Sequence, residues 1–405
     1  MDTNFGSLTS FSAQALSEHS LEEEVLSRYA KGAKEVEAGL CCPAAHYDSK
    51  FLKVLPNEIL QTDYGCGDPS RFVNTGETVV DLGSGSGKVC YILAQKVGPY
   101  GRVIGVDFNP AMLALARKHR AAISDKLGYD NVRFVRARIQ DMALDLDTAE
   151  SWLREHPVDT ADRWLALEAH CAHLRQSAPA VPDEAADLVV SNCVLNLVKP
   201  EDKHDLFDEI FRVLKRGGRA VISDIVCDED PTPNMLNDPG LWSGCISGAF
   251  REDSLVDRFA QAGFYGVEIL QRQSNPWQVI DGIEFRAMTI RAYKGKEGPC
   301  LERRQAVVYK GPFSRIHDDD GHVFLRGKRA AVCDKTFHIL TNPQGPYAGM
   351  FEAIPPHMEV SLGDALPFDC SHGSLRDPRE TKGKDFRETS LQVPGTSPCQ
   401  PGKCC

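Results

Sequence analysis

Short apolar runs alternate with amphipathic stretches between residues 77 and 139. The runs ETVVDLG, GRVIGVD and NVRFVRARI have the length of buried strands, and VCYILAQKV and AMLALARKHRAAI, which lie between them, have helical spacing. Strand, helix, strand, helix and strand in close succession is the pattern of βαβ units. The pattern therefore predicts a parallel sheet.

Two later segments extend this sheet. Residues 186–192 and 218–225 are predicted strands, and the amphipathic helix KHDLFDEIFRVLK and the turn KRGG separate them. An insertion at 145–183 before the first of them is predicted to be helical, and its residues indicate no function. The fold class predicted is α/β, with a doubly wound, mostly parallel, Rossmann-like sheet.

The pattern changes again on both sides of this domain. Residues 1–45 predict a helical segment that ends in the pair Cys41 and Cys42, and the main domain is expected over 46–227. Mixed helical and strand patterns then predict a small α+β region at 228–296 and a small C-terminal domain at 297–370. Residues 371–405 have few large apolar side chains, so a disordered tail is expected there.

Composition narrows the function classes. The chain has 405 residues, of which 42% are hydrophobic and 25% are charged, as in an ordinary globular protein. Its formal charge of -11 disfavours binding to nucleic acid or to anionic lipid. The first twenty residues contain no Lys or Arg, and no apolar window approaches the roughly 18 residues of a membrane span. We expect a cytoplasmic monomer with no membrane attachment.

The loop after the first strand has the sequence Asp81-Leu-Gly-Ser-Gly-Ser-Gly87. Glycines let the main chain turn tightly and approach a ligand, and Asp107 ends the next strand, where a carboxylate can accept both hydroxyls of a ribose. The third glycine of the dinucleotide fingerprint is replaced by Lys88, and Asp81 would attract the ammonium group of a methionine. A plain strand-to-helix turn also fits the glycines, but Asp107 favours a nucleotide-type site.

This loop resembles the D-x-G-x-G-x-G fingerprint of methyltransferases that use S-adenosylmethionine (SAM), and KRGG resembles the turn before the fifth strand of that superfamily. The resemblance implies SAM as co-substrate. The residues expected to bind it here are Asp81, Gly83, Gly85, Gly87, Asp107, Met112, Ile139 and Gln140, with Asp141 beside them.

The fourteen cysteines of the chain include three that the topology aims at this pocket, namely Cys66, Cys193 and Cys245. Cys193 follows the fourth strand, and ligands of open α/β sheets bind beyond the carboxyl ends of the strands. Cysteines 399, 404 and 405 fit either metalloid capture or exposed thiols. The others are expected to be small buried hydrophobic residues, namely Cys90, Cys171, Cys227, Cys300, Cys333 and Cys370.

Four segments make the resemblance more specific. YGCG, DLGSGSG, SNCVLNLV and LWSGCISGA, in this order, resemble the arsenite methyltransferase family, as do the upstream cysteine pair and the cysteine-rich tail. The likeness covers residues 40 to 300 best. It implies methylation of arsenite, or of its glutathione conjugate, to mono- and dimethylated arsenicals in arsenic detoxification.

The same resemblance assigns roles to residues, and it implies that 228–296 is the substrate-binding region. Cys66, Cys193 and Cys245 would bind trivalent arsenic as substrate, and Cys41 or Cys42 would be the fourth catalytic cysteine, which forms a disulfide with the Cys66 position. Thioredoxin or glutathione would reduce that disulfide. The SAM side of the pocket would be lined by Tyr64, Gly65 and Asn192.

The chemistry agrees with these residue types, because trivalent arsenic is soft and prefers thiolates. Three thiolates leave its lone pair free as the nucleophile, so no general base is required. Two alternatives remain: a SAM-dependent methyltransferase of a carbon or oxygen nucleophile, such as a quinone or sterol, and a non-catalytic thiol protein that binds soft metals. The lack of a recognisable base argues against the first, and the loop with Asp107 argues against the second.

Overall fold

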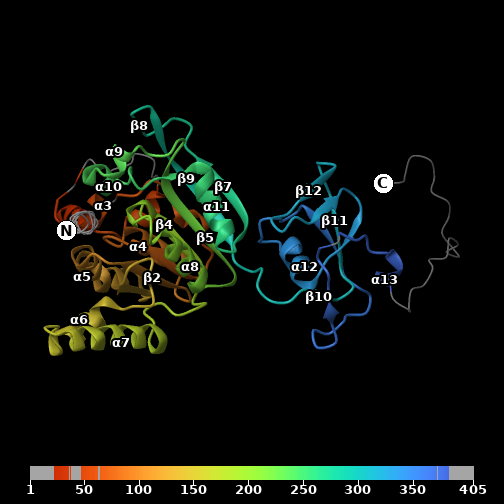
Figure 1. The fold of residues 1–405 in the computed structure, drawn as a ribbon, viewed down its shortest axis with the longest axis horizontal. Coiled ribbons are helices and arrows are strands. Elements are labelled where there is room, and N and C mark those ends of the chain that lie inside the picture. The colour runs from red at the N-terminus through yellow and green to blue at the C-terminus, as the bar shows by residue number, and fades with distance from the viewer. Residues whose placement is uncertain (1–21, 36, 38–46, 63, 372, 383–405) are drawn as a thin grey trace, which may run out of the picture. The chain divides into compact units, whose positions relative to one another are not determined.

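The computed structural model describes residues 22–35, 37, 47–62, 64–371 and 373–382. The chain divides into two compact units, Met1–Lys296 and Glu297–Cys405 (Figure 1). No helix in the described ranges is long and apolar enough to cross a membrane.

A mixed sheet of nine strands is the centre of the first unit. Its main order is β3-β2-β1-β4-β5-β9-β7, with β6 beside β5 and β8 beside β9. The first five strands are parallel to one another, and β9 runs antiparallel to both β5 and β7. The strands are β1 (Thr78–Leu82), β2 (Arg102–Asp107), β3 (Val132–Arg136), β4 (Ala186–Asn192), β5 (Leu214–Cys227), β6 (Phe250–Arg251), β7 (Tyr265–Arg272), β8 (Gln278–Ile280) and β9 (Ile283–Tyr293).

Helices cover both faces of this sheet. Successive side chains of a strand point to opposite faces, so apolar residues on both faces have to be covered. Val79 of β1 packs with the face that carries α3 (Asn57–Gln61), α4 (Lys88–Val97) and α5 (Pro110–Leu127). Its neighbour Val80 packs with the other face, beneath α8 (Lys203–Val213) and α11 (Glu252–Gln261). The predicted doubly wound α/β fold is therefore confirmed.

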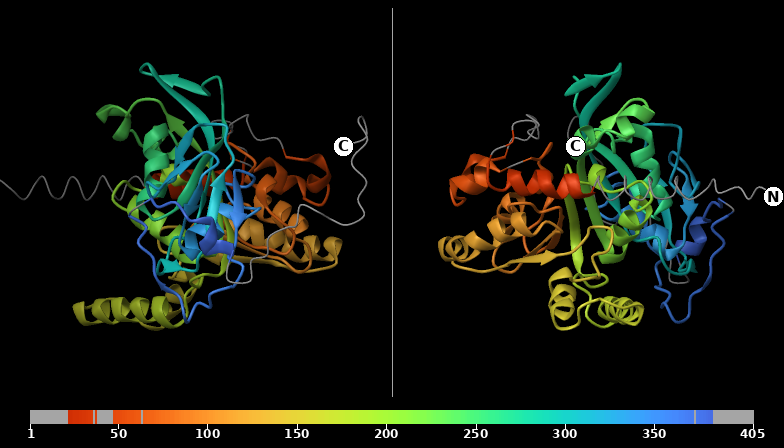
Figure 2. Two further views of the ribbon diagram at one scale, coloured as in Figure 1. Left: turned by 90° about the vertical axis from the view of Figure 1, so that its right-hand side faces the viewer. Right: turned by 60° about the vertical axis from the view of Figure 1, so that its left-hand side comes forward.

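The insertion between β3 and β4 forms two helices, α6 (Leu146–Glu155) and α7 (Ala161–Ser177), as predicted. Both figures of the whole chain show them as a pair at the margin of the first unit (Figures 1 and 2). An N-terminal helix covers residues 22–32 and is drawn in red in Figure 2. The remaining short elements are α2 (Ser49–Leu52), η2 (Pro69–Phe72), η3 (Leu195–Leu197), α9 (Pro233–Leu236) and α10 (Pro239–Ser243).

Residues 228–296, expected to form a small α+β region, are part of the same unit as the main domain. Its strand β9 pairs with β5 over nine residues, from Tyr293 opposite Arg219 to Phe285 opposite Cys227. An antiparallel partner for β5 buries the strand edge that a parallel sheet would otherwise expose. The α+β content predicted for this region is present, and its role in substrate binding stays a prediction.

The second unit has a small core around Val307, Tyr309, Phe324 and Leu340. Its elements are β10 (Leu301–Glu302), β11 (Ala306–Tyr309), β12 (Arg315–His317), β13 (Val323–Leu325), β14 (Arg329–Ala331), α12 (Asp334–Thr341), β15 (Phe351–Ile354), β16 (Leu366–Pro367) and α13 (Pro378–Lys382). Strand β11 pairs with β14 and β15, and β10 pairs with β16.

The prediction of a disordered tail from residue 371 onward is wrong at the start of that range. Leu375 pairs with Ala330 through a β-bridge, and α13 follows it. The Arg376 guanidinium is buried and bonded to the carboxylates of Glu302 and Glu380. Polar contacts therefore order this segment, and an argument from its low apolar content could not anticipate them. Residues 383–405 lie outside the described residues.

Candidate active site

The glycine loop connects β1 to α4 and leaves room for a ligand. Gly87 has φ of 84° as the residue before α4, and Gly83 and Gly85 also have positive φ, which glycine adopts without strain. A Cβ on Gly85 would meet nothing within 4 Å. The buried Ser84 hydroxyl has no hydrogen-bond partner within the described part of the chain. The open space and the unused donor fit a bound polar molecule.

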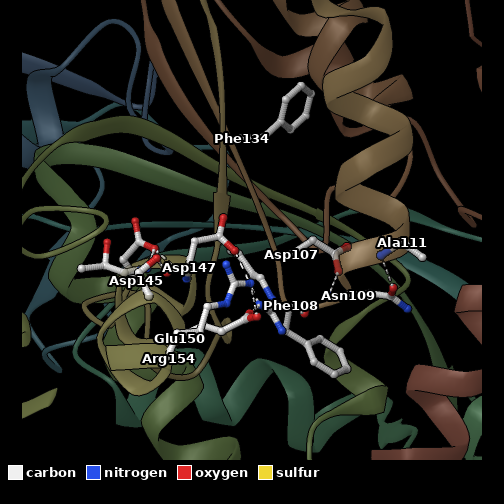
Figure 3. A network of polar contacts seen from close by, with 12 residues as sticks. Asp107, Phe108, Asn109, Ala111, Phe134, Asp145, Asp147, Glu150 and Arg154 are labelled. Atoms are coloured by element: carbon white, nitrogen blue, oxygen red, sulfur yellow. Dashed lines mark hydrogen bonds and ion pairs between the residues drawn. The ribbon is translucent and has the colours of Figure 1, made fainter. Parts of the chain in front are cut away.

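Two buried carboxylates face this loop. Asp107 at the end of β2 accepts hydrogen bonds from the backbone N–H groups of Gly85 and Asn109, both at 2.8 Å. Figure 3 shows Asp107 beside Asn109, which caps α5. Burial raises the pKa of Asp107, and it raises that of Asp81 to about 7, although the Cys90 thiol donates to Asp81 at 3.1 Å. A cationic ligand would relieve this desolvated negative charge.

One cavity joins nearly all of the residues predicted to bind SAM. It is lined by Tyr64, Gly65, Asp81, Gly83, Gly85, Asp107, Met112, Ile139, Gln140 and Asn192. Gly87 is not part of the lining, because it turns the chain into α4 against the ring of Phe134. Asp141 also lies elsewhere, since its carboxylate pairs with Arg175 of α7 at 2.8 Å. The cavity lies between the carboxyl ends of β1 and β4, where the strand order reverses and ligands of this fold class bind.

Asn192, the last residue of β4, fixes the YGCG loop. Its side-chain oxygen accepts from the backbone N–H groups of Cys66 at 2.9 Å and Gly67 at 3.0 Å. A Cβ on Gly65 would lie 2.1 Å from the Asn192 amide. The loop needs glycine there because it approaches β4 so closely. These contacts place Cys66 next to the residue that follows Asn192, which is Cys193.

Cys66, Cys193 and Cys245 come together in one buried cluster, with exposed fractions of 1%, 7% and 4%. The Cys245 thiol lies 3.4 Å from the backbone oxygen of Cys193. The hydrogen bond with Cys193 and burial raise the pKa of Cys245 well above its ordinary value. A hydrogen bond from Cys245 lowers the pKa of Cys193, but contact with the Cys66 thiol and burial outweigh it and raise that pKa too. Cys193 and Cys245 are therefore neutral thiols at neutral pH.

Asp224 on β5 organises the turn that carries Cys193. Its carboxylate accepts from the backbone N–H groups of Val194 at 3.1 Å and Leu195 at 2.8 Å. Burial raises the pKa of Asp224 to about 6. Asn196 links the same turn to the third cysteine, because its side-chain amide donates to the backbone oxygens of Ile225 and Cys245.

The N-terminal helix completes the cavity, and its part in the site was not predicted. Tyr29 lines it, and its hydroxyl lies 3.8 Å from the Cys245 sulfur. Arg28 donates to the backbone oxygen of Gly240 and to the Ser243 hydroxyl, both at 3.0 Å. Glu22 forms an ion pair with Arg138 at 3.1 Å. The periodicity predicted this helix, but no local signal shows which face of it covers a site distant in sequence.

Further residues of the lining were also missed. They are Glu22, Val25, Thr62, Ser84, Ser86, Lys88, Val89, Phe108, Asn109, Arg138, Val194, Leu197 and Val198. Most of them are sequence neighbours of predicted residues. They could have been found by including the whole of each loop that carries a predicted residue. Cys41 and Cys42 lie outside the described residues.

The remaining cysteines only partly follow the expectation of burial. Cys90, Cys227 and Cys333 are buried, whereas Cys171, Cys300 and Cys370 are half-exposed. The prediction was wrong for these three. Cys300 and Cys370 lie close to strands of only two residues, and Cys171 lies on α7 at the margin of the first unit, so these elements do not enclose the side chains.

Family models match three parts of the chain. Two models described as a methyltransferase domain match residues 74–172 and 146–222, and a model described as a domain of unknown function (DUF8838) matches residues 296–386. The loop, the strand order and these matches define the first unit as a SAM-dependent methyltransferase domain with a Rossmann-like fold.

Relatives at the level of the whole chain are more specific. An arsenite methyltransferase of Aquipseudomonas alcaligenes is 28% identical over 86% of this chain and 96% of its own, and the human arsenite methyltransferase is 26% identical over 96% and 98%. The crystal structure of an arsenic(III) S-adenosylmethionine methyltransferase from Chlamydomonas reinhardtii has 28% identity and a TM-score of 0.50, over 79% of this chain and 98% of its own. Over most of its length the chain is therefore similar to arsenite methyltransferases.

Proposed function

We propose that this chain methylates thiol-bound trivalent arsenic with SAM as the methyl donor. One observation carries the proposal. Cys193 lines the cavity between β1 and β4, and it also belongs to the buried cluster that contains Cys66 and Cys245. A soft ligand held by these thiols would therefore border the space in which the proposed SAM residues meet.

The proposed SAM residues divide into three groups by chemistry. Asp81 offers a negative charge to the amino acid end, and Asp107, with its remaining acceptor positions, suits the ribose hydroxyls. Met112 and Ile139 offer apolar contacts to the adenine. When bound, SAM supplies an electrophilic methyl group on a cationic sulfur.

The thiols would hold the substrate and orient it. Arsenite exchanges its three hydroxyls for three thiolates, and the thiol protons leave with those hydroxyls as water. The arsenic lone pair is then the nucleophile, and no side chain has to remove a proton from it. Burial of Cys66, Cys193 and Cys245 excludes water from the reacting atoms. Such positioning is worth on the order of 7 to 11 kcal/mol.

The proposal includes a redox partner and a compartment. Methyl transfer to the lone pair converts trivalent arsenic to the pentavalent state. Cys41 or Cys42 would form a disulfide with Cys66 as the two thiols give two electrons that return arsenic to the trivalent state, and glutathione or thioredoxin would then reduce the disulfide. Free thiols persist in a reducing compartment, so we assign the protein to the cytoplasm.

The alternatives are methylation of a small organic carbon or oxygen nucleophile and metal binding without catalysis. The first alternative does not require three thiols from distant segments. The second does not require a cavity suited to SAM beside those thiols. The deciding experiment is incubation of the reduced protein with arsenite and SAM, followed by separation of the arsenic species. Mono- and dimethylated arsenicals are the expected products. Unmethylated arsenite after prolonged incubation, with SAM shown to bind, would overturn the proposal.

A further inference from the structure

A second group of thiols lies in the second unit, outside the site described above. The Sγ atoms of Cys300, Cys333 and Cys370 all lie within 4.8 Å of one another. None of the three is in a disulfide. A metal–sulfur bond is about 2.3 Å long, so two sulfurs on one centre are at most about 4.6 Å apart. Small side-chain rotations would bring the three sulfurs onto one centre.

Three separate elements supply these cysteines. Cys300 precedes β10 and Cys370 follows β16, and the two strands pair antiparallel, with the backbone N–H of Phe368 donating to the carbonyl of Cys300 at 2.9 Å. Cys333 is the residue before α12, where its sulfur accepts from the backbone N–H of Thr336 at 3.4 Å. The pairing of β10 with β16 thus carries two of the thiols to the start of α12.

An ion pair and a hydrogen bond hold this arrangement in place. The Arg303 guanidinium pairs with the carboxylate of Asp334, the first residue of α12, at 2.7 Å. Lys335 donates to the backbone oxygen of Gly298 at 3.0 Å. Both contacts connect the segment around Cys300 to the segment around Cys333. The thiols therefore converge through a built framework rather than through flexible loops.

The cluster is accessible as well as preformed. Cys333 is fully buried, whereas Cys300 and Cys370 are half-exposed. Cys333 and Cys370 also line a cavity with Thr336 and Phe368. A small ion can reach the sulfurs from the exposed side and be enclosed on the other.

We propose that Cys300, Cys333 and Cys370 form a second thiol site, which binds a trivalent thiophilic metalloid such as arsenite. Binding forms three arsenic–sulfur bonds and breaks three arsenic–oxygen bonds, and the three thiol protons leave with hydroxide as three waters. Arsenic stays trivalent, so the step needs no oxidant or reductant. Arsenite as the ligand in the cell rests on the proposed function, but the thiol site itself does not.

The number of donors favours this ligand over zinc. Structural zinc takes four protein ligands, whereas trivalent arsenic is satisfied by three thiolates. Within the described residues, the cluster contains three donors and no histidine or carboxylate among them. His322 borders the same cavity, but it is not among the ligand atoms that lie within 4.8 Å of one another.

The test counts arsenic bound to the reduced full-length chain without SAM. Cys399, Cys404 and Cys405 are first replaced together by serine, so that the tail contributes no thiols. This background is expected to retain two equivalents of arsenite through gel filtration, and Cys333→Ser on it is expected to retain one. Serine is a favoured residue before a helix, so this variant keeps the contact with Thr336. Cys370→Ser provides a second, half-exposed position, and thermal melting checks that both variants fold.

Matched controls separate the two sites. Cys171→Ser removes a half-exposed thiol on α7 and should leave both equivalents bound. Cys245→Ser should lose the equivalent of the first site, and X-ray absorption of the arsenic that remains should show three sulfur neighbours. Retention of both equivalents by Cys333→Ser and Cys370→Ser would overturn the proposal. So would zinc in the purified background protein that arsenite does not displace and that Cys333→Ser lacks.

Methylation assays keep the two proposals distinct. If the background protein binds two equivalents but forms no methylated product, the proposed function fails and the second site stands. If Cys333→Ser methylates arsenite normally and retains one equivalent fewer, both stand.

Discussion

The thiol of Cys245 points at the backbone oxygen of Cys193, 3.4 Å away, and both residues have left-handed backbone conformations, with φ of 62° and 65°. Positive φ is uncommon outside glycine and costs of order 1 to 3 kcal/mol at such residues. Asn196 and Asp224 hold the two turns through the backbone contacts described above. The fold thus maintains two strained turns whose effect is to direct two thiols toward one point.

We expect Cys193→Ser and Cys245→Ser each to abolish every methylation step. Two thiolates are the minimum that can hold an arsenic that already carries a methyl group, and a serine hydroxyl is a hard donor that trivalent arsenic binds poorly. The measurement is arsenic speciation after reaction with arsenite and SAM. The fluorescence of buried Trp242, three residues before Cys245, should also stop responding to arsenite.

Cys171→Ser is the control for these two variants, because it makes the same substitution on α7. It should methylate at the wild-type rate. Near wild-type product from either Cys193→Ser or Cys245→Ser would remove that residue from the arsenic site.

Asp107→Ala should weaken SAM binding by roughly 1.5 to 3 kcal/mol, the range for hydrogen bonds to a charged acceptor. Arsenite binding should be unchanged, since the thiols belong to other segments. Calorimetric titration with SAM measures the first effect and arsenite-dependent fluorescence the second.

Asp145→Ala is a fitting control for Asp107→Ala. Asp145 also accepts backbone N–H groups at a helix start, those of Asp147 and Thr148, but it lies at α6, outside the cavity (Figure 3). If the two variants bound SAM equally well, Asp107 would not be a SAM ligand.

The affinity for SAM should fall as the pH drops through neutrality. Asp81 has a pKa of about 7 because of burial, so it is largely charged at pH 8 and largely protonated at pH 6. A cationic ligand binds the charged form better, and binding below pH 7 must first remove a proton, at a cost of at most about tenfold in affinity per pH unit. Titrations from pH 6 to 8 would measure this dependence.

Asp81→Asn isolates the contribution of this carboxyl. The amide oxygen can still accept from Cys90, so the local contact is retained while the charge is lost. The variant should bind SAM more weakly at pH 8 and with a flatter pH profile than the wild type. The same slope in both proteins would assign the titration to another group.

The central sheet and the loop from Asp81 to Gly87 could be predicted because their signals are local: apolar runs, glycine spacing and a carboxylate at a strand end. Cys193 was predictable for the same reason, since the end of a parallel strand determines its side of the sheet. The role of Tyr29 could not be read in this way. Its place depends on a helix that packs over strands far along the chain.

The second thiol cluster was missed for a related reason. Cys300, Cys333 and Cys370 have no zinc-like spacing, and only the pairing of β10 with β16 brings the first and last together. Short strands of two residues carry almost no periodic signal. Their cysteines were therefore indistinguishable in sequence from small buried residues.

The roles of Cys66 and of the upstream pair should be separable by substrate valence. Cys66→Ser, and the double change Cys41→Ser with Cys42→Ser, should impair the first methylation but leave methylation of monomethylated trivalent arsenic partly intact. Arsenite has three exchangeable ligands and uses three thiolates. The monomethylated substrate has one position blocked by carbon, so it engages only Cys193 and Cys245.

Initial rates on each arsenical at saturating SAM measure the difference. Asn192 holds the Cys66 loop through its backbone, so Cys66→Ser leaves that framework in place and changes only the donor atom. A loss of arsenite turnover with residual turnover of the methylated substrate is the expected result. Equal losses on both substrates would mean that Cys66 acts in every round, and the division into a two-thiol core and an auxiliary thiol would be wrong.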